Sequence, residues 1–181
     1  MNQNVLHTEN LSIGYKTKSE TNTIIQNCDI QLQKGKLVAL VGANGIGKST
    51  LLKTITGIIP TIEGSVFLND KKIQSYLPKD LAQELSIVLT ESLPPSNLSV
   101  YEIVALGRQP YTNWLGTLSE EDKNKVEEAI LLTGIESFKH KKHYEISDGQ
   151  LQKTLIARAL AQDTALIILD EPTTHLDLVH K

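Results

Sequence analysis

The chain has 181 residues, of which 40% are hydrophobic, so it is long enough for one domain with a sizeable core. Its formal net charge of −3 argues against a broad nucleic-acid-binding surface. The single cysteine, Cys28, excludes an internal disulfide and fits a reducing compartment. The first nine residues lack the charged n-region and apolar h-region of a signal peptide, and no apolar run approaches the roughly 18 residues of a membrane span. We therefore expect a cytosolic protein without direct membrane insertion.

The N-terminal part has the composition of strands. Residues 5–13 and 24–32 read as two strands joined by a polar turn at residues 16–22. Tyr15 lies just past the first strand, where the residue alone indicates a half-exposed aromatic side chain.

A glycine-rich loop follows the apolar run 37–41, which we expect to be a buried strand. Residues 42–49 match G-x-x-x-x-G-K-[ST]. Its fixed positions are Gly42, Gly47, Lys48 and Ser49. The next residues predict a helix that ends near Gly57, with Leu51, Leu52 and Ile55 on one face. The loop therefore lies between a strand and a helix N-terminus, as a phosphate-binding loop requires.

Phosphate chemistry explains these residue types. Glycine permits positive φ, so successive N–H groups can point into one concavity at the positive end of the helix dipole. The ammonium of Lys48 can reach the β- and γ-phosphates, and the hydroxyl of Ser49 can bind Mg²⁺. The alternative is a glycine-rich turn that happens to contain Lys-Ser.

The middle of the chain continues the alternation of strands and helices. A turn at residues 63–64 leads to a strand at 65–68, and Asn-Asp at 69–70 makes the next turn. Residues 85–89 form an apolar run that predicts a buried strand, and the proline-rich segment 94–97 predicts a loop.

Two helices should follow, each with a sequence-level start signal. Ser99 and Glu102 have the spacing of a capping box, and this helix should end at Gly107. Ser119 opens a second helix in the same way, with acidic residues in its first turn, and this helix should end at Gly134. These helices interrupt the strand–helix alternation and indicate a helical insertion.

The segment 140–143 contains two histidines that could suggest a metal pair, but a solvated charged surface is the better interpretation. Residues 146–150 lead into a helix, and a loop at a helix N-terminus offers a second anion site. Serine, aspartate and glycine are also ordinary capping residues, so this signal is weak alone. The apolar face of the helix comprises Leu151, Leu155, Ile156, Ala159 and Leu160.

Two adjacent carboxylates follow the apolar run 165–169, which predicts a buried parallel strand. Ligands of open α/β sheets bind at the carboxyl ends of strands, and buried carboxylates need a positive partner. With a phosphate-binding loop upstream, Mg²⁺ would supply that charge. Asp170 would hold the metal and Glu171 would polarise the attacking water. The alternative is that this Asp-Glu pair is simply a helix cap.

Together these motifs resemble the nucleotide-binding subunit of an ABC transporter. Residues 42–49 match its Walker A loop, 147–150 its signature loop, 165–171 its Walker B strand and 173–177 its D-loop. Residues 104–111, with Trp114 and the acidic helix start at 119–122, resemble the importer branch for iron–siderophore, haem and cobalamin cargo.

The resemblance implies an α/β fold. Its P-loop NTPase core would have a mainly parallel sheet, an N-terminal antiparallel β-subdomain and an inserted helical subdomain. Residues 1–181 would form a single nucleotide-binding domain. Its approximate parts would be the β-subdomain strands at 1–35, the P-loop core at 36–90, the helical subdomain at 91–150, and the signature helix, Walker B and D-loop at 151–181.

The resemblance also assigns roles to residues. Tyr15 would stack on adenine, Ser49 and Asp170 would serve Mg²⁺, and Glu171 would be the general base. Ser147, Gly149 and Gln150 would contact ATP bound to a second copy in a head-to-tail dimer. The full set expected to bind ATP is Tyr15, Gly42, Asn44, Gly45, Gly47, Lys48, Ser49, Thr50, Ser147, Gly149 and Gln150.

Three departures from the family pattern stand out. Asp148 replaces a glycine of the signature, and we expect its carboxylate to point away from the nucleotide. Thr90, followed by Glu91, holds the place of the Q-loop glutamine, and either could offer an oxygen to the metal. The family continues with a further strand and a switch histidine, for which His175 and His180 come too early. We therefore expect a truncated chain with an exposed strand edge, poor solubility and little turnover.

The function implied is ATP hydrolysis that drives import through membrane permease subunits. The protein would lie on the inner face of the cell membrane, held there by the permease, and would have no nucleic-acid partner. One alternative is a shortened ABC protein that binds ATP with little hydrolysis. Another is a soluble ABC ATPase that acts on DNA or ribosomes, in which tandem cassettes or a long coiled-coil insertion would be expected. The cargo itself is chosen by the permease and its binding protein.

Overall fold

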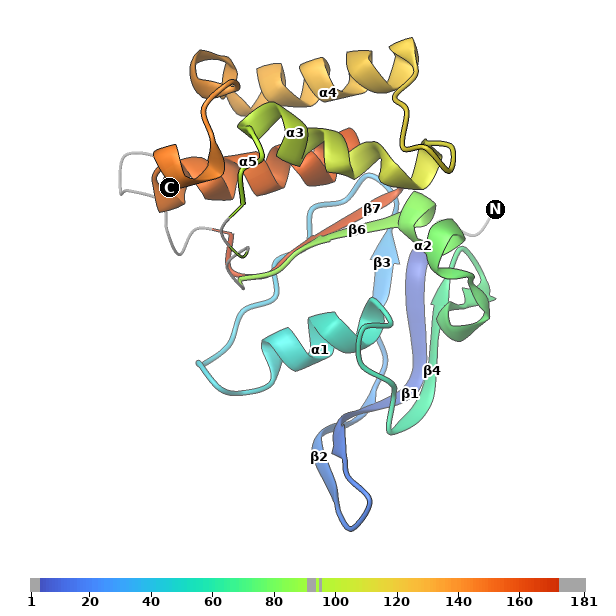
Figure 1. Cartoon of the computed structure of the whole chain (residues 1–181). Helices are drawn as coiled ribbons and strands as arrows, with labels where there is room; N and C mark the ends of the chain where they lie inside the picture. The colour runs from blue at the N-terminus through green and yellow to red at the C-terminus, as the bar shows by residue number, and fades with distance from the viewer. Residues whose placement is uncertain (1–3, 91–93, 95, 173–181) are drawn as a thin grey trace. The chain divides into compact units, whose positions relative to one another are not determined.

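The computed structural model describes residues 4–90, 94 and 96–172. The chain divides into two compact units, Met1–Glu84 and Leu85–Lys181. Figure 1 shows the elements of both, and each unit is described by itself below.

The first unit is built on a five-stranded sheet around one long strand, β1. The strands are β1 (Asn4–Lys16), β2 (Thr21–Cys28), β3 (Gln31–Gln33), β4 (Glu63–Leu68) and β5 (Lys71–Lys72). All pairings in this sheet are antiparallel, in the order β2-β1-β4-β5, and β3 also pairs with β1. The predicted antiparallel β-subdomain is therefore confirmed.

The predicted strand 24–32 is two strands. The break lies at residues 29–30, and just before it Asn27 of β2 has a φ of 51°, in the left-handed region that asparagine tolerates. The side chain of Thr8 bridges the break, because its hydroxyl donates to the carbonyl of Cys28 and accepts from the N–H of Ile30. The turn predicted at residues 69–70 is confirmed, since it joins β4 to β5.

The apolar run 37–41 is not the buried strand that its composition predicts. It forms no strand, and Leu37 and Val41 are 101% and 88% exposed. A buried strand needs neighbouring strands that accept its backbone hydrogen bonds. Among the described residues of the first unit, β1 already pairs with β2, β3 and β4 and no strand pairs with 37–41.

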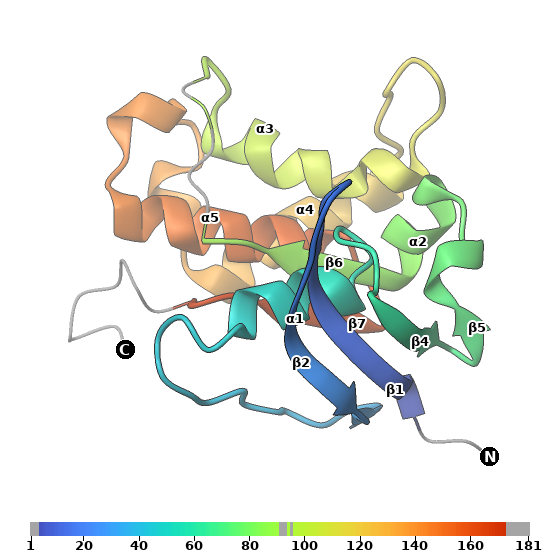
Figure 2. The same ribbon diagram turned by 90° about the horizontal axis from the view of Figure 1, so that it is seen from below.

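The helix after the glycine-rich loop is confirmed as α1 (Lys48–Ile55). It packs against β1 through a face that includes Leu51 and Ile55, which are 5% and 3% exposed. Gly57 ends it with a left-handed φ of 77°. A short helix, α2 (Pro78–Glu84), and a 3₁₀ turn, Ile73–Ser75, complete the unit and were not predicted. Figure 2 shows α1 beside β1 from below.

The second unit contains a two-stranded parallel sheet of β6 (Leu85–Val88) and β7 (Leu166–Leu169). Among the described residues, β6 and β7 are the strands that pair in parallel. This pairing confirms both apolar runs as strands, although Leu169 is 36% exposed, so β7 is less buried than predicted. Helix residues Ile103 and Leu155 pack in one apolar cluster with Val88 of β6.

Three helices lie side by side over this sheet in the second unit (Figure 1). They are α3 (Val100–Ala105), α4 (Glu120–Thr133) and α5 (Asp148–Ala161), joined by 3₁₀ turns at Leu106–Tyr111, Glu136–Phe138 and His143–Glu145. Each α-helix begins with a capping box, at Ser99, Ser119 and Ser147. Both helix starts predicted for the insertion are therefore confirmed, and Gly134 ends α4 as predicted.

Gly107 does not end the first inserted helix as predicted, because α3 stops at Ala105 and a 3₁₀ turn continues through it. A Cβ at Gly107 would lie 2.3 Å from the carbonyl oxygen of Arg158. The glycine is therefore required for close approach to α5.

A buried ion pair ties the turn after α3 to the other helices. Arg108 and Asp122 are 4% and 5% exposed, and the Nε of Arg108 donates to Oδ1 of Asp122 over 2.8 Å. Arg108 also donates from Nη1 to the carbonyl of Ala161 and lies over the ring of Tyr111. Burial disfavours ionisation of Asp122, but the hydrogen bonds from Ser119 and Arg108 outweigh it and hold the pKa below its usual 3.8.

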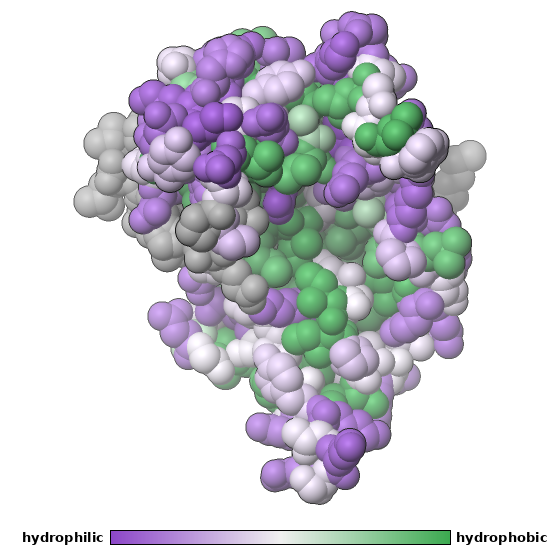
Figure 3. All heavy atoms as spheres, in the orientation of Figure 1, coloured by the Kyte–Doolittle hydropathy of each residue, from purple (hydrophilic) through white to green (hydrophobic). Residues whose placement is uncertain are grey.

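Hydrophobic side chains are visible among polar ones on the face shown in Figure 3. Exposed apolar residues include Leu37, Val41, Trp114 and Leu115. No helix among residues 4–90, 94 and 96–172 is long and apolar enough to cross a membrane.

Candidate functional site

The glycine-rich loop of the first unit accepts hydrogen bonds from its own lysine. The Nζ of Lys48 donates to the carbonyl oxygens of Gly42 and Ala43, over 2.9 and 3.0 Å. The ammonium is therefore held by carbonyl oxygens of the exposed loop. Sequence reasoning did not assign Ala43 a role, because any residue type can supply a carbonyl.

The N-terminus of α1 has no side-chain cap. Its N-cap residue is Gly47, at a left-handed φ of 106°, and no acidic residue lies in the first turn. Peptide N–H groups at a helix start lack intrahelical partners and carry the positive end of the dipole. An anion such as phosphate is the ligand that such a terminus favours.

Two glycines of the loop are required by geometry. Gly45 and Gly47 have φ values of 79° and 106°, which side-chain-bearing residues rarely adopt. A Cβ at Gly47 would also lie 2.5 Å from Cγ2 of Ile24 on β2. The start of α1 can therefore approach the β1–β2 hairpin this closely only with glycine at position 47.

Tyr15 lies beside the P-loop helix, although residue type alone indicated only a half-exposed strand-end aromatic. It is 50% exposed, which agrees with that description. Its hydroxyl is hydrogen-bonded to Oγ1 of Thr50 over 3.1 Å. The structure thus brings together three predicted nucleotide-binding elements of the first unit: the ring, the loop and the start of α1.

The predicted metal residue of the second unit, Asp170, is 5% exposed at the end of β7. Its N–H donates to the carbonyl of Val88 over 2.8 Å, which extends the β6–β7 pairing by one bond. The hydroxyl of Thr90 donates to the carbonyl of Asp170 over 3.3 Å. Thr90, at the Q-loop position, therefore lies beside the Walker B end of the strand.

Glu171, the predicted general base, is exposed and has a φ of 48°. The left-handed region is uncommon for glutamate and costs on the order of 1–3 kcal/mol. Such strained residues cluster at functional sites, so the conformation is in keeping with the predicted role.

The signature loop is the capped start of α5. Oγ of Ser147 accepts from the N–H of Gln150, and the N–H of Ser147 donates to Oε1 of Gln150. Gly149 lies between them in the first turn. Asp148 is exposed there, where a carboxylate complements the helix dipole, so it has a local stabilising role. Its orientation toward a nucleotide stays a prediction.

Several predicted positions lie outside the described residues. They are Glu91, the D-loop at 173–177, His175 and His180. Asn44 is described, and it lies exposed in the turn of the glycine-rich loop.

The predicted Mg²⁺ ligands suit that ion chemically. Ser49 and Thr90 offer hydroxyl oxygens and Asp170 a buried carboxylate, and Mg²⁺ takes hard oxygen ligands, usually few from protein. Within the described ranges, no group of three or more His, Cys, Asp or Glu side chains could hold a metal.

The solvated-surface prediction for 140–143 is half wrong. His140 is exposed, but His143 is 9% exposed, and its Nδ1 accepts from the N–H of Ser96 over 3.3 Å. The 3₁₀ turn that begins at His143 packs this ring inward, which charge patterning does not reveal.

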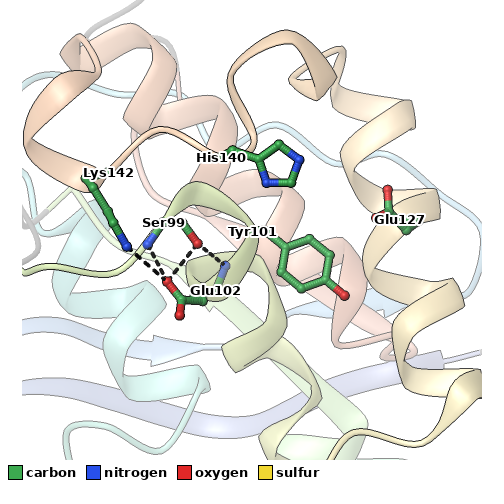
Figure 4. A pocket seen from close by; sticks show the side chains of 6 residues that line it. All are labelled: Ser99, Tyr101, Glu102, Glu127, His140 and Lys142. Carbon is green, nitrogen blue, oxygen red and sulfur yellow. Dashed lines mark hydrogen bonds and ion pairs between the residues drawn. The ribbon is translucent and has the colours of Figure 1, made fainter.

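An open hollow of about 610 Å³ lies on the second unit (Figure 4). Its lining residues are Ser99, Tyr101, Glu102, Glu127, His140 and Lys142. Glu102 caps α3 there, and its hydrogen bonds from Ser99 hold its pKa below 4.5. None of the residues predicted to bind nucleotide lines this hollow.

Comparisons with known proteins agree with these motifs. The ABC transporter family model matches residues 25–174. An uncharacterized ABC transporter ATP-binding protein of Methanocaldococcus jannaschii is 44% identical over 98% of this chain and 60% of its own length. The iron(3+)-hydroxamate import ATP-binding protein FhuC of Bacillus subtilis is 41% identical over 98% of this chain and 65% of its own length.

The fold is likewise similar to that of solved cassettes. A dimeric ATP-binding cassette in a post-hydrolysis state, bound to ADP and Pi, matches with a TM-score of 0.80 and 28% identity. That match covers 96% of this chain and 77% of the other chain. The chain spans 60% and 65% of the lengths of the two curated relatives.

Proposed function

Because the chain belongs to the ABC transporter family, we propose that it is the ATP-binding and ATP-hydrolysing subunit of an importer. The observation that carries this proposal is the P-loop geometry. The uncapped N-terminus of α1 and the Lys48 ammonium, held by the carbonyls of Gly42 and Ala43, provide positive charge at one loop. A triphosphate is the ligand that this arrangement suits.

In the first unit, the loop amides and Lys48 bind the phosphates, and Tyr15 stacks on adenine. Thr50 and Ser49 offer hydroxyls at the start of α1. The half-exposed ring of Tyr15 supports its role, because an exposed aromatic face is a platform for a base.

In the second unit, Asp170 and Thr90 offer oxygens to Mg²⁺. When bound, the ion neutralises charge on the phosphates. Glu171 accepts a proton from the attacking water as general base, and its exposed position supports access of water.

The signature residues Ser147, Gly149 and Gln150 contact ATP held by a second copy of the chain, in a head-to-tail dimer. The similar fold of a dimeric cassette supports this assembly. Residues 1–181 act as one nucleotide-binding domain, with the helical part at 91–150 receiving the permease.

The cargo is an iron–siderophore, haem or cobalamin-type compound. The name of the relative from Bacillus subtilis, an iron(3+)-hydroxamate import protein, favours the iron–siderophore class. The chain acts at the inner face of the membrane through its permease subunits.

The test measures ATP binding and phosphate release side by side for the parent chain, Glu171→Gln and Lys48→Ala. We expect Glu171→Gln to retain ATP binding and lose turnover, on the order of 10²-fold or more. Lys48→Ala should lose binding. Phosphate release that is unchanged in Glu171→Gln would contradict the assigned base, and unchanged binding in Lys48→Ala would contradict the site.

Importer coupling needs a separate measurement. We expect the chain to co-purify with a membrane permease, and to restore iron–hydroxamate uptake to cells that have the permease but lack its ATP-binding subunit. Co-purification with nucleic acid or ribosomes instead would favour a soluble ABC ATPase.

A further inference from the structure

The Tyr15–Thr50 contact joins two parts of the first unit that are 35 residues apart in sequence. Tyr15 is on β1 and pairs with Asn22 of β2, so its backbone is fixed by the sheet. Thr50 is 8% exposed in the first turn of α1. The hydroxyl oxygens of the two side chains are 3.1 Å apart, and either can be the donor.

The surrounding backbone leaves little freedom on either side of this bond. A Cβ at Gly14 would lie 2.0 Å from the carbonyl oxygen of Asn22, so the strand that carries Tyr15 crosses β2 closely. On the other side, Gly47 lies against Ile24 of β2. The hairpin and the start of α1 therefore meet at two places, one apolar and one polar.

The direction of the bond matters for a phosphate ligand. If Tyr15 donates to Oγ1 of Thr50, the Thr50 proton remains available for a phosphate oxygen. If Thr50 donates to Tyr15, that proton is used. A bound triphosphate would favour the first arrangement, and the ring would then be held at a set position beside the phosphates.

We propose that the Tyr15–Thr50 hydrogen bond is a positioning device that makes the aromatic ring and the P-loop helix one preformed seat for a nucleoside triphosphate. This inference rests on the proposed function, because it assigns the hydroxyl of Tyr15 a task in the same site. The ring alone would supply stacking. The hydroxyl supplies preorganisation, which raises affinity by reducing the ordering cost of binding.

The inference separates two ligands, a nucleotide and a bare phosphate chain. Only a nucleotide touches both the ring and the loop. The probes are adenylyl imidodiphosphate, a non-hydrolysable ATP analogue, and inorganic tripolyphosphate. Their dissociation constants with the whole chain and Mg²⁺ are measured by calorimetry.

We expect Tyr15→Phe to bind the ATP analogue about three- to tenfold more weakly, the range for one lost hydrogen bond. Tripolyphosphate affinity should change by less than about twofold, since its contacts lie within the loop. Tyr144→Phe, which removes the hydroxyl of an exposed tyrosine in the second unit, is the matched control and should match the parent.

A double-mutant cycle identifies the partner. In a Thr50→Val background, Tyr15→Phe should have no further effect on the ATP analogue, whereas in Thr50→Ser, which keeps the hydroxyl, its effect should return. Melting temperatures of all variants are measured alongside to detect any loss of stability. A purely structural bond would weaken the affinities for both ligands equally.

Three results would overturn the inference. They are an unchanged affinity of Tyr15→Phe for the ATP analogue, an equal weakening of both ligands, and full additivity with Thr50→Val. Failure of the parent chain to bind the ATP analogue would instead overturn the proposed function, and the inference with it.

Discussion

The helices of the second unit and helix α1 of the first unit differ in how their N-termini are capped. In the second unit, α3, α4 and α5 all start at a serine whose side chain accepts a backbone N–H, and the third helical residue reaches back. In the first unit, α1 starts at Gly47 without any side-chain cap. The three helices of the second unit bond their own first-turn backbone through these side chains, whereas the N-cap residue of α1 makes no such bond.

This difference separates stability from binding. A capping box adds about 1 kcal/mol to a helix and places its polar side chains against its own backbone. An open terminus forgoes that stabilisation and keeps donors directed outward. The contrast teaches that α5, although it carries the predicted signature residues, caps its own start, while the start of α1 has the uncapped N–H groups that an anion favours.

The largest effect should come from Asp122, which caps α4 and pairs with Arg108 in the interior. Asp122→Ala leaves the buried guanidinium unpaired, and we expect a loss of about 3–5 kcal/mol in the free energy of unfolding. Urea denaturation measures this loss. Glu127→Gln breaks a surface pair with Lys139 and should cost less than about 1 kcal/mol. Similar losses for both variants would refute the structural role of the pair.

The next effect tests whether α1 can accept the cap that the other helices use. Gly47→Ser introduces a good capping residue, yet we expect destabilisation of about 1–3 kcal/mol because position 47 has a φ of 106°. Thermal unfolding and ATP binding should both worsen. The reciprocal change, Ser147→Gly, should cost only a few tenths of a kcal/mol, about what glycine costs at an N-cap. A stabilised Gly47→Ser variant would contradict the strain expected at the left-handed φ of position 47.

Removing one cap while keeping the buried Arg108–Asp122 pair should have a smaller effect. Ser119→Ala loses the hydrogen bond to the N–H of Asp122, and we expect about 1 kcal/mol of destabilisation by urea denaturation. Ser137→Ala, at an exposed serine in the turn after α4, is the control and should be neutral. If both variants behave alike, the capping box of α4 contributes nothing measurable.

The pH dependence of stability should reflect the titration of the Asp122 carboxylate. Because the folded pKa of Asp122 lies below 3.8, its contribution is fully present above that value and is lost as pH falls through the folded pKa. Stability measured from pH 6 downward should decline less steeply in Asp122→Ala than in the parent. Parallel curves would mean that Asp122 does not titrate with a lowered pKa.

The smallest effect should come from the segment before the loop. Leu37 is 101% exposed, so Leu37→Ser should change stability by less than about 0.5 kcal/mol. Ile103→Ala, at a residue 1% exposed, should cost about 2–5 kcal/mol under the same conditions. A large loss in Leu37→Ser would mean that residues 37–41 pack as the buried strand that composition predicts.

Local signals in the sequence predicted the helices of the second unit well, because a capping box needs only residues three apart. Ser99 and Ser119 begin helices as predicted, and Gly134 ends one. The Asn69-Asp70 turn was predicted for the same reason. The exposed, non-strand conformation of residues 37–41 was not predicted, because burial of a strand depends on partners elsewhere in the chain.

The candidate site likewise has features that local sequence patterns predict and contacts that they do not. The glycine and lysine spacing of the P-loop is local, and its helix start is confirmed. The contacts of Tyr15 with Thr50 and of Thr90 with Asp170 span 35 and 80 residues, and no local pattern indicates them. The burial of Arg108 with Asp122 is equally non-local, since two charged residues usually predict a solvated surface.

The measurement that tests the central claim most directly is equilibrium binding of Mg²⁺–ATP by the parent chain and by Lys48→Ala. Lys48 donates only within the exposed loop in the contacts described for its ammonium, so its removal should leave the melting temperature unchanged. We predict that ATP affinity falls by on the order of 10²-fold, about 2.7 kcal/mol. Equal ATP affinity of the two proteins, with the fold intact in both, would contradict the claim that the open start of α1 is a nucleotide site.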